Sequence, residues 1–104
     1  KIGDGAFKDC TLLQSITLPS TVTEVGARAF ANCNNLRKVT LNEGLQKIED
    51  GAFGECTSLQ SVTLPSTVVE ISSYAFGSCS NLREVIFNDG LKKIGDHAFY
   101  YCTS

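Results

Sequence analysis

The sequence has few charged residues and no long apolar run, and these two shortages exclude whole classes of protein. Charged residues make up 19% of the 104 positions and the formal net charge is −2, so the chain is not a strongly basic nucleic-acid binder. A hydrophobic content of 42% excludes a disordered tail. No apolar stretch approaches the roughly 20 residues of a membrane span, and no secretory leader opens the chain. We therefore expect one small soluble domain with no targeting signal in this sequence.

Motifs for catalysis and for ligand binding are also missing. The sequence has no C-x-x-C pair for a metal, no G-x-S-x-G nucleophile motif, no glycine-rich phosphate loop and no H-E-x-x-H. His97 is the single histidine, and without a nucleophile motif we interpret it as an exposed turn residue. No basic patch alternates with aromatic residues, as single-stranded nucleic acid would require. The sequence thus predicts no enzyme, no cofactor, no metal site and no nucleic-acid partner.

What the sequence does contain is a repeat of 23 residues. The dipeptide Ala-Phe, the cysteines and several columns of leucine, isoleucine and valine all recur at this step. An internal repeat of this length indicates a stack of similar units, so these columns are expected to form the core. Five cysteines is an odd number, which excludes a fully paired intramolecular disulfide framework. The cysteines are Cys10, Cys33, Cys56, Cys79 and Cys102.

Each repeat predicts a short strand, a bend and a compact turn. Alternating apolar and polar residues through 13–18 predict a half-buried strand, and Pro19 or Asn42 then bends the chain. Asp50 is a helix-capping residue type, so residues 50–56 are expected to form one or two helical or 3-10 turns. One repeat alone cannot bury enough apolar surface to offset the entropy of ordering its chain. The strands should therefore stack in parallel, about 4.8 Å apart.

A second, longer period overlies the first. Residues 10–55 and 56–101 are identical at more than half of their positions. Odd repeats carry Leu-Pro-Ser-Thr-Val, at 18–22 and 64–68, and even repeats carry Asn-Glu-Gly-Leu or Asn-Asp-Gly-Leu, at 42–45 and 88–91. The repeats were therefore duplicated in pairs, and the sequence gives no role for the pairing.

The repeat L-x-x-I/V-x-L-P-x-x-V-x-x-I-x-x-x-A-F-x-x-C closely resembles the BspA-like leucine-rich repeats over essentially the whole chain. The resemblance implies an α/β repeat fold: a right-handed leucine-rich-repeat solenoid, with a parallel β-sheet on one face and short helical or 3-10 turns on the other. We expect residues 1–104 to form a single array of about four and a half repeats. Because neither end carries a polar capping repeat, we expect this array to be a segment of a longer one.

The cysteine column is expected to be a ladder of small, buried, free thiols, a role that cysteine fills well. Neighbouring cysteines of stacked repeats would also lie close enough to form disulfides, but five equivalent inward positions favour the thiol ladder and no disulfide. Cys10 and Cys102, at the two ends, are expected to be the most reactive.

The candidate binding site is the outward side of the strands, because solenoids bind their partners on an extended concave surface. Ile86 is the one apolar residue in a threonine column, and it is either a contact anchor or an ordinary exposed residue. The candidate binding residues are Gln14, Ser15, Thr17, Arg37, Lys38, Thr40, Gln60, Ser61, Thr63, Arg83, Glu84 and Ile86.

The resemblance also implies a function. We expect a non-enzymatic protein–protein interaction or adhesion module of a surface or secreted protein, which places the chain outside the cell or at the cell surface. A host or extracellular-matrix protein is the expected class of partner. Two alternatives stay open: a structural spacer or stalk, and a regulatory array of a larger protein. The uncapped ends also allow end-to-end self-association.

Overall fold

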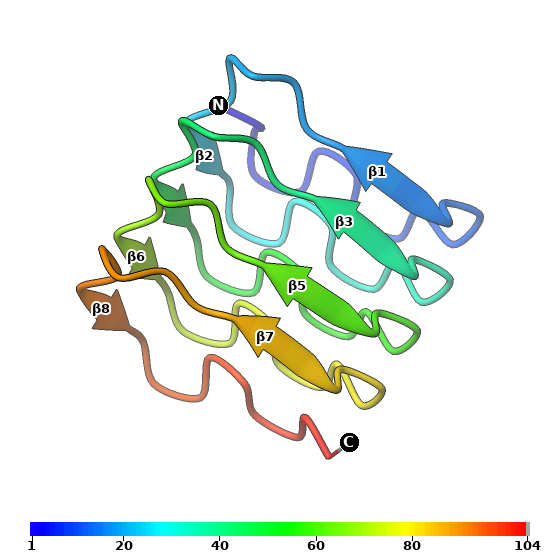
Figure 1. Cartoon of the computed structure of the whole chain (residues 1–104). Coiled ribbons are helices and arrows are strands. Elements are labelled where there is room, and N and C mark those ends of the chain that lie inside the picture. Colours follow the sequence, from blue (N-terminus) through cyan, green and yellow to red (C-terminus); the bar gives the residue numbers. More distant parts are fainter. Residues whose placement is uncertain (104) are drawn as a thin grey trace.

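In the computed structural model, residues 1–103 form a solenoid whose successive turns lie side by side (Figure 1). Each turn adds a three-residue strand to one parallel sheet and a two-residue strand to a second. The first sheet contains, in order, β1 (Ser15–Thr17), β3 (Lys38–Thr40), β5 (Ser61–Thr63) and β7 (Glu84–Ile86). The second contains β2 (Glu24–Val25), β4 (Lys47–Ile48), β6 (Glu70–Ile71) and β8 (Lys93–Ile94). The predicted parallel stacking of the repeats is confirmed.

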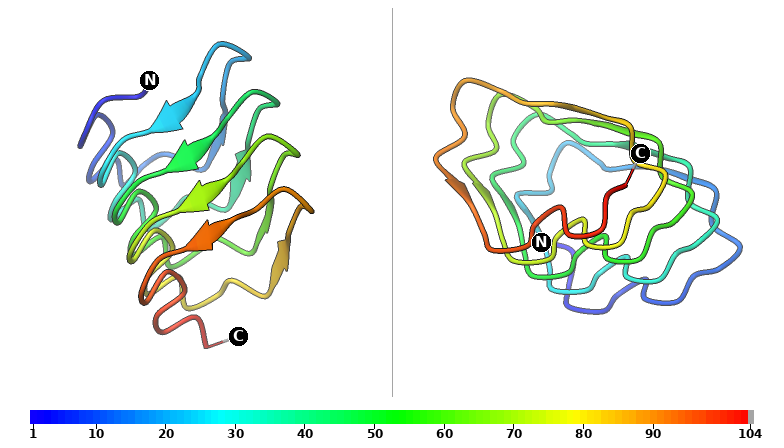
Figure 2. Two further views of the ribbon diagram at one scale, coloured as in Figure 1. Left: turned by 90° about the vertical axis from the view of Figure 1, so that its left-hand side faces the viewer. Right: turned by 90° about the horizontal axis from the view of Figure 1, so that it is seen from below.

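The register of both sheets places equivalent residues of successive repeats on top of one another. Ile16 pairs with Val39 in the first sheet, and Val25 pairs with Ile48 in the second. The phenylalanines show the same register in the core, where their rings stack with centroids 5.2–5.5 Å apart and interplanar angles of 2–6°. The stacked rings belong to Phe7, Phe30, Phe53, Phe76 and Phe99. The apolar columns of the sequence therefore form one continuous core, visible end-on as nested coils in Figure 2.

The third side of the coil is built from turns. We call it the turn face, and it comprises residues 3–10, 26–33, 49–56, 72–79 and 95–102. Residues 1–103 contain no α-helix and no 3-10 helix, so the helical or 3-10 turns expected over 50–56 are not found. The fold is a solenoid made of strands and turns rather than an α/β repeat.

The backbone of the turn face explains why a helix does not form there. In the turn around Phe53, Gly51 (φ 62°) and Glu55 (φ 59°) are left-handed, a conformation that a right-handed helix cannot contain. The amides also alternate between two kinds of partner. The N–H of Phe53 donates to Ala75 of the next turn at 2.7 Å, whereas the N–H of Gly54 donates to Gly51 of its own turn at 2.9 Å. Every second amide of the turn therefore donates to the neighbouring turn and is not available for the bonds within the segment that a helix would need.

The pairing of repeats in the sequence has a counterpart in the first sheet. Three residue pairs join β1 to β3 and three join β5 to β7, but only Lys38 and Ser61 pair between β3 and β5. At the two complete junctions the bond from Leu18 to Thr40 (3.0 Å) or from Leu64 to Ile86 (2.9 Å) extends the ladder. Within residues 1–103 no equivalent bond runs from the amide of Leu41 to the next turn. The ladder of the first sheet is thus complete within each pair of turns and incomplete between the two pairs.

Gly95 lies closer to the preceding turn than a side chain allows. A Cβ atom there would lie 2.5 Å from the Ser73 nitrogen and 2.7 Å from the Ser72 carbonyl carbon. We predict that Gly95→Ala lowers the free energy of unfolding by about 1–3 kcal/mol, the usual effect of overpacking. Gly3 occupies the same place in its repeat, and a Cβ atom added there would have nothing within 4 Å, so Gly3→Ala is the control. Urea denaturation measures both, and equal effects of the two substitutions would contradict the prediction.

Candidate functional site

The outward side of the first sheet carries every residue predicted to bind a partner. We call this surface the strand face: the outward residues of β1, β3, β5 and β7, together with the residue that precedes each strand. In β3 the central Val39 is buried, whereas Lys38 and Thr40 on either side are exposed. The residues that precede the strands (Gln14, Arg37, Gln60 and Arg83) are exposed as well. The structure therefore brings the twelve candidates together on one surface, and their role in binding stays a prediction.

The polar side chains of the strand face have no polar partners among residues 1–103. Within residues 1–103, none of them makes a side-chain hydrogen bond or an ion pair. The second sheet is different, because its charges pair across turns: Lys1 lies 3.9 Å from Glu24, and Lys47 lies 4.0 Å from Glu70. The charges of Arg37, Lys38, Arg83 and Glu84 are thus available to another molecule.

A hollow of about 370 Å³ opens on the strand face between β3 and β5. It lies where the ladder between the two strands is incomplete, so the buried Val39 and Leu64 line part of it. Candidate binding residues line the rest, namely Lys38, Thr40, Ser61 and Thr63. At its edge the Ser66 hydroxyl donates to Glu43 at 2.8 Å. The open junction between the two-turn units therefore gives the strand face a concave centre.

Ile86 ends β7 beside Thr63 of β5 and is 49% exposed. An exposed isoleucine in a column of threonines can anchor a partner by burying its side chain. The structure shows the exposure that this role requires, and the anchor stays a prediction.

The five cysteines form a column at the edge of the core, and each is a free thiol. Cys33, Cys56 and Cys79 are buried, whereas Cys10 and Cys102 are partly exposed. The Cys56 thiol donates to the Phe30 carbonyl oxygen at 3.3 Å, and the other cysteines except Cys10 make the equivalent bond at 3.1–3.2 Å. That carbonyl oxygen already accepts the amide of Cys33 at 3.4 Å. The Cys56 thiol therefore donates to the second lone pair of the Phe30 carbonyl oxygen. A purely apolar residue could not make this bond.

Burial raises the pKa of Cys33 to about 11 and also raises the pKa of Cys102. A hydrogen bond with Cys56, together with burial, raises the pKa of Cys79. A thiol whose folded pKa exceeds its unfolded value favours the folded state at neutral pH. That contribution disappears as the pH rises from the unfolded value of 9.0 toward the folded one. The thiol ladder should therefore destabilise the protein in alkali.

We predict that the difference in stability between the wild type and Cys33→Ala shrinks between pH 8 and about pH 11, because only the wild type loses the Cys33 contribution. Urea denaturation at several pH values measures the difference. If the free energies of unfolding of the two proteins change with pH in parallel over this range, the prediction is wrong.

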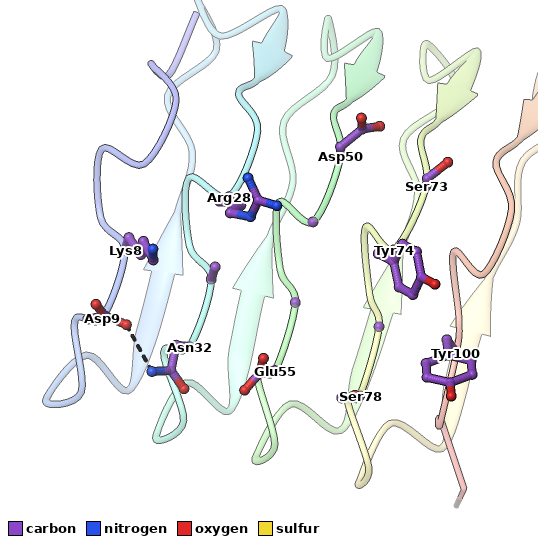
Figure 3. Close-up of a pocket in the computed structure, with 14 residues that line it drawn as sticks. Lys8, Asp9, Arg28, Asn32, Asp50, Glu55, Ser73, Tyr74, Ser78 and Tyr100 are labelled. Atoms are coloured by element: carbon purple, nitrogen blue, oxygen red, sulfur yellow. Dashed lines mark hydrogen bonds between the residues drawn. The ribbon is translucent and has the colours of Figure 1, made fainter.

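A second hollow, which the sequence analysis missed, lies on the turn face and measures about 560 Å³ (Figure 3). The signal for it is present in one repeat position, occupied in turn by Lys8, Ala31, Gly54, Gly77 and Tyr100. The small residues of the middle repeats form its floor, and the long side chains of the outer repeats close its two ends. A groove therefore runs across all five segments of the turn face, on the side away from the strand face.

Sites of other kinds are not found in the part of the chain that the structure describes. Residues 1–103 contain no group of three or more potential metal ligands. They also contain no helix that could cross a membrane. His97 is exposed and stacks on Tyr74 with ring centroids 5.1 Å apart, and within the same residues no side-chain hydrogen bond joins it to a nucleophile.

Comparison with known proteins agrees with this architecture. The model of a family described as the BspA type leucine rich repeat region matches residues 1–104 in six copies. The chain belongs to this family. BspA-type repeats are leucine-rich repeats, which generally serve as protein-interaction modules and are typically non-enzymatic. The 23-residue period and the stacked phenylalanines described above are therefore features of this family's repeat.

Solved structures of other leucine-rich repeat proteins share the fold of this BspA-type chain. The leucine-rich repeat protein of T. pallidum is 35% identical with a TM-score of 0.95, over 97% of this chain and 47% of that protein. A leucine-rich cell surface protein of Faecalibacterium prausnitzii is 30% identical with a TM-score of 0.94, over 98% of this chain and 27% of that protein. This chain therefore spans less than half the length of either protein. No curated protein shows significant similarity.

Proposed function

We propose that this BspA-type array binds a protein partner through the strand face and serves an adhesion or interaction role at a cell surface. The observation that carries the proposal is a continuous set of twelve exposed side chains of which none has a polar partner within residues 1–103. Surfaces of this kind suit protein recognition, because arginine fixes a partner by directed hydrogen bonds and a central hollow accepts a side chain.

The distribution of charge supports a protein partner rather than a nucleic acid. Arg37 and Lys38 lie on one turn, and Arg83 lies beside the acidic Glu84 on another. Neutral polar residues of β5 separate the two groups. Binding to a phosphate backbone needs a field of one sign, whereas mixed charges around an apolar centre are typical of protein interfaces.

The cell-surface part of the proposal is supported by one similar structure. The protein of Faecalibacterium prausnitzii is described as a cell surface protein, and this chain matches about a quarter of its length. A host or extracellular-matrix protein is the class of partner that such a location would present.

The proposal is tested by substituting four strand-face residues together. The variant Arg37→Ala, Lys38→Ala, Arg83→Ala, Ile86→Ala removes the charges of two turns and the exposed isoleucine. We expect the wild-type chain to bind at least one member of a panel of purified extracellular-matrix proteins in surface plasmon resonance. The variant should bind that protein at least about 100-fold more weakly, because hot-spot residues dominate interface energy. Its urea midpoint should be unchanged, since all four side chains are exposed.

A matched control changes the same number of residues elsewhere. The variant Lys8→Ala, Arg28→Ala, Lys92→Ala, Lys93→Ala removes four exposed positive charges that lie off the strand face. Undiminished binding by the strand-face variant would show that the strand face is not the site. No binding by the wild type to any member of the panel would favour the spacer or stalk alternative.

A further inference from the structure

The groove on the turn face is walled by two side chains that occupy the same place in alternate repeats. Arg28 and Tyr74 stand two repeats apart, with Gly51 between them. The Arg28 side chain leans over Gly51, and the Tyr74 ring lies against Gly77. A Cβ atom on either glycine would come within 3.2–3.3 Å of those side chains. The two glycines, which have no side chain, thus form part of the floor of the groove. Arg28 and Tyr74, labelled in Figure 3, stand beside that floor.

Tyr74 is held in a conformation that would suit glycine better. Its φ is 57°, in the left-handed region, and Gly51 at the equivalent place in the preceding repeat has φ 62°. Side chains other than glycine are strained there. Arg28 (φ 55°) and His97 (φ 59°) occupy the same place in their own repeats with the same backbone conformation, so what distinguishes Tyr74 is the aromatic ring that it adds to the lining of the groove.

The ring belongs to a small exposed aromatic cluster at one end of the groove. Tyr74 and Tyr100 are 47% and 42% exposed and meet edge to face with centroids 5.7 Å apart. His97 stacks on Tyr74, and Tyr101 lies against Tyr100 at 4.4 Å. The rings pack directly on one another, so no space is left between them for a cation. They form a platform rather than a cage.

The rest of the groove is lined by polar groups that lack partners. Among the described residues, the side chains of Lys8, Arg28, Asp50 and Glu55 make no hydrogen bond or ion pair. Asp9 is the exception, because it accepts a bond from Asn32 at 2.8 Å. The groove is therefore lined by both donors and acceptors, with charges of both signs.

This chemistry selects among ligand classes. A phosphate or sulfate group would face three carboxylates, and an apolar ligand would strip water from charged groups without replacing their hydrogen bonds. A neutral sugar fits both features, because each hydroxyl can donate to a carboxylate or accept from a guanidinium, and the C–H face of the ring can lie on a tyrosine. The linear shape, which crosses all five segments of the turn face, suits a short chain of sugars.

We propose that the turn-face groove binds a neutral oligosaccharide, with Tyr74 and Tyr100 as the stacking platform and Asp50, Glu55 and Arg28 as hydrogen-bonding partners of its hydroxyls. This site is separate from the strand face and independent of the function proposed above. One array would then hold a glycan on one side and a protein on the other.

Affinity electrophoresis in gels that contain mannan, mixed-linkage β-glucan or xylan tests the proposal directly. We expect at least one of these neutral polysaccharides to retard the wild-type chain. Tyr74→Gly should weaken that binding at least about ten-fold while leaving the fold intact, because glycine relieves the left-handed strain. Tyr100→Ala should weaken it comparably, and Asp50→Asn should weaken it by less than either.

Controls separate this site from the other one. The fourfold strand-face variant should be retarded like the wild type, because its substitutions lie on another face. Retardation that survives Tyr74→Gly would overturn the proposal, and so would no retardation by any of the three polysaccharides. Binding to heparin alone would overturn it in favour of an anionic ligand, and binding to immobilised peptides alone would overturn it in favour of a protein segment.

Discussion

Phe53→Ala should lower the free energy of unfolding by about 3–5 kcal/mol, as expected when a fully buried phenylalanine is truncated. The Phe53 side chain is completely buried and stacks on Phe30 at 5.2 Å and on Phe76 at 5.3 Å. Its loss removes a ring from the middle of the column and leaves a cavity that touches two turns. Since domains of this size are stable by about 5–15 kcal/mol in total, the substitution should remove a large fraction of the stability.

Urea denaturation followed by far-ultraviolet circular dichroism measures this loss. Phe7 belongs to the same column but is 40% exposed and, among residues 1–103, stacks on one ring, that of Phe30. Phe7→Ala is therefore the matched control and should have less than half of the effect. If the two substitutions destabilise the protein equally, the core is not held together by contacts between neighbouring turns in the way that the stacked rings indicate.

Deleting Val62 should have a still larger effect, because it shifts the register of one strand by a residue. Val62 is buried at the centre of β5, with exposed Ser61 and Thr63 on either side. A one-residue slip in a strand moves side chains to the opposite face, so Thr63 would enter the core and the following apolar columns would lose their alignment. We expect a loss of about 5 kcal/mol or more, enough to unfold the half of the array that contains the deletion.

Inserting a second copy of residues 34–79 after Cys79 is the matched control for this deletion. That insertion changes the length far more than the deletion does, but it preserves both the 23-residue step and the alternation of odd and even repeats. Stability in solenoids is a sum of repeat and nearest-neighbour terms, so the longer chain should be more stable than the wild type. An insertion that destabilises the protein would contradict a structure governed by register.

The sequence was sufficient to predict the features that depend on equivalence between repeats. A strict step of 23 residues fixes which side chains stack, so the phenylalanine column and the parallel strands could be predicted without coordinates. The outward placement of Lys38 and Thr40 follows from the two-residue period of a strand around Val39.

Features that depend on backbone geometry could not be predicted in this way. Glu55 adopts a left-handed φ, although glutamate carries no signal for that conformation, so the turn around Phe53 resembled a short helix in sequence. The open ladder between β3 and β5 leaves no mark in the strand residues, because Val39 and Val62 lie between outward residues just as in the other strands. The turn-face groove could have been found by comparing side-chain size down the column from Lys8 to Tyr100, because a run of small residues between large ones predicts a hollow.

The uneven ladder of the first sheet has a mechanical consequence. Between β3 and β5 one residue pair is joined, yet in the second sheet both pairs between β4 and β6 are intact. The turn face is also bonded across this junction, for example from Phe53 to Ala75 on one side and from Phe30 to Ala52 on the other. When the array bends, the deformation should therefore concentrate between β3 and β5, where the first sheet has the fewest bonds, while the second sheet and the turn face keep the two turns joined. A long array of such units would flex in steps of two turns, and each step would widen or narrow the hollow between β3-type and β5-type strands on the strand face.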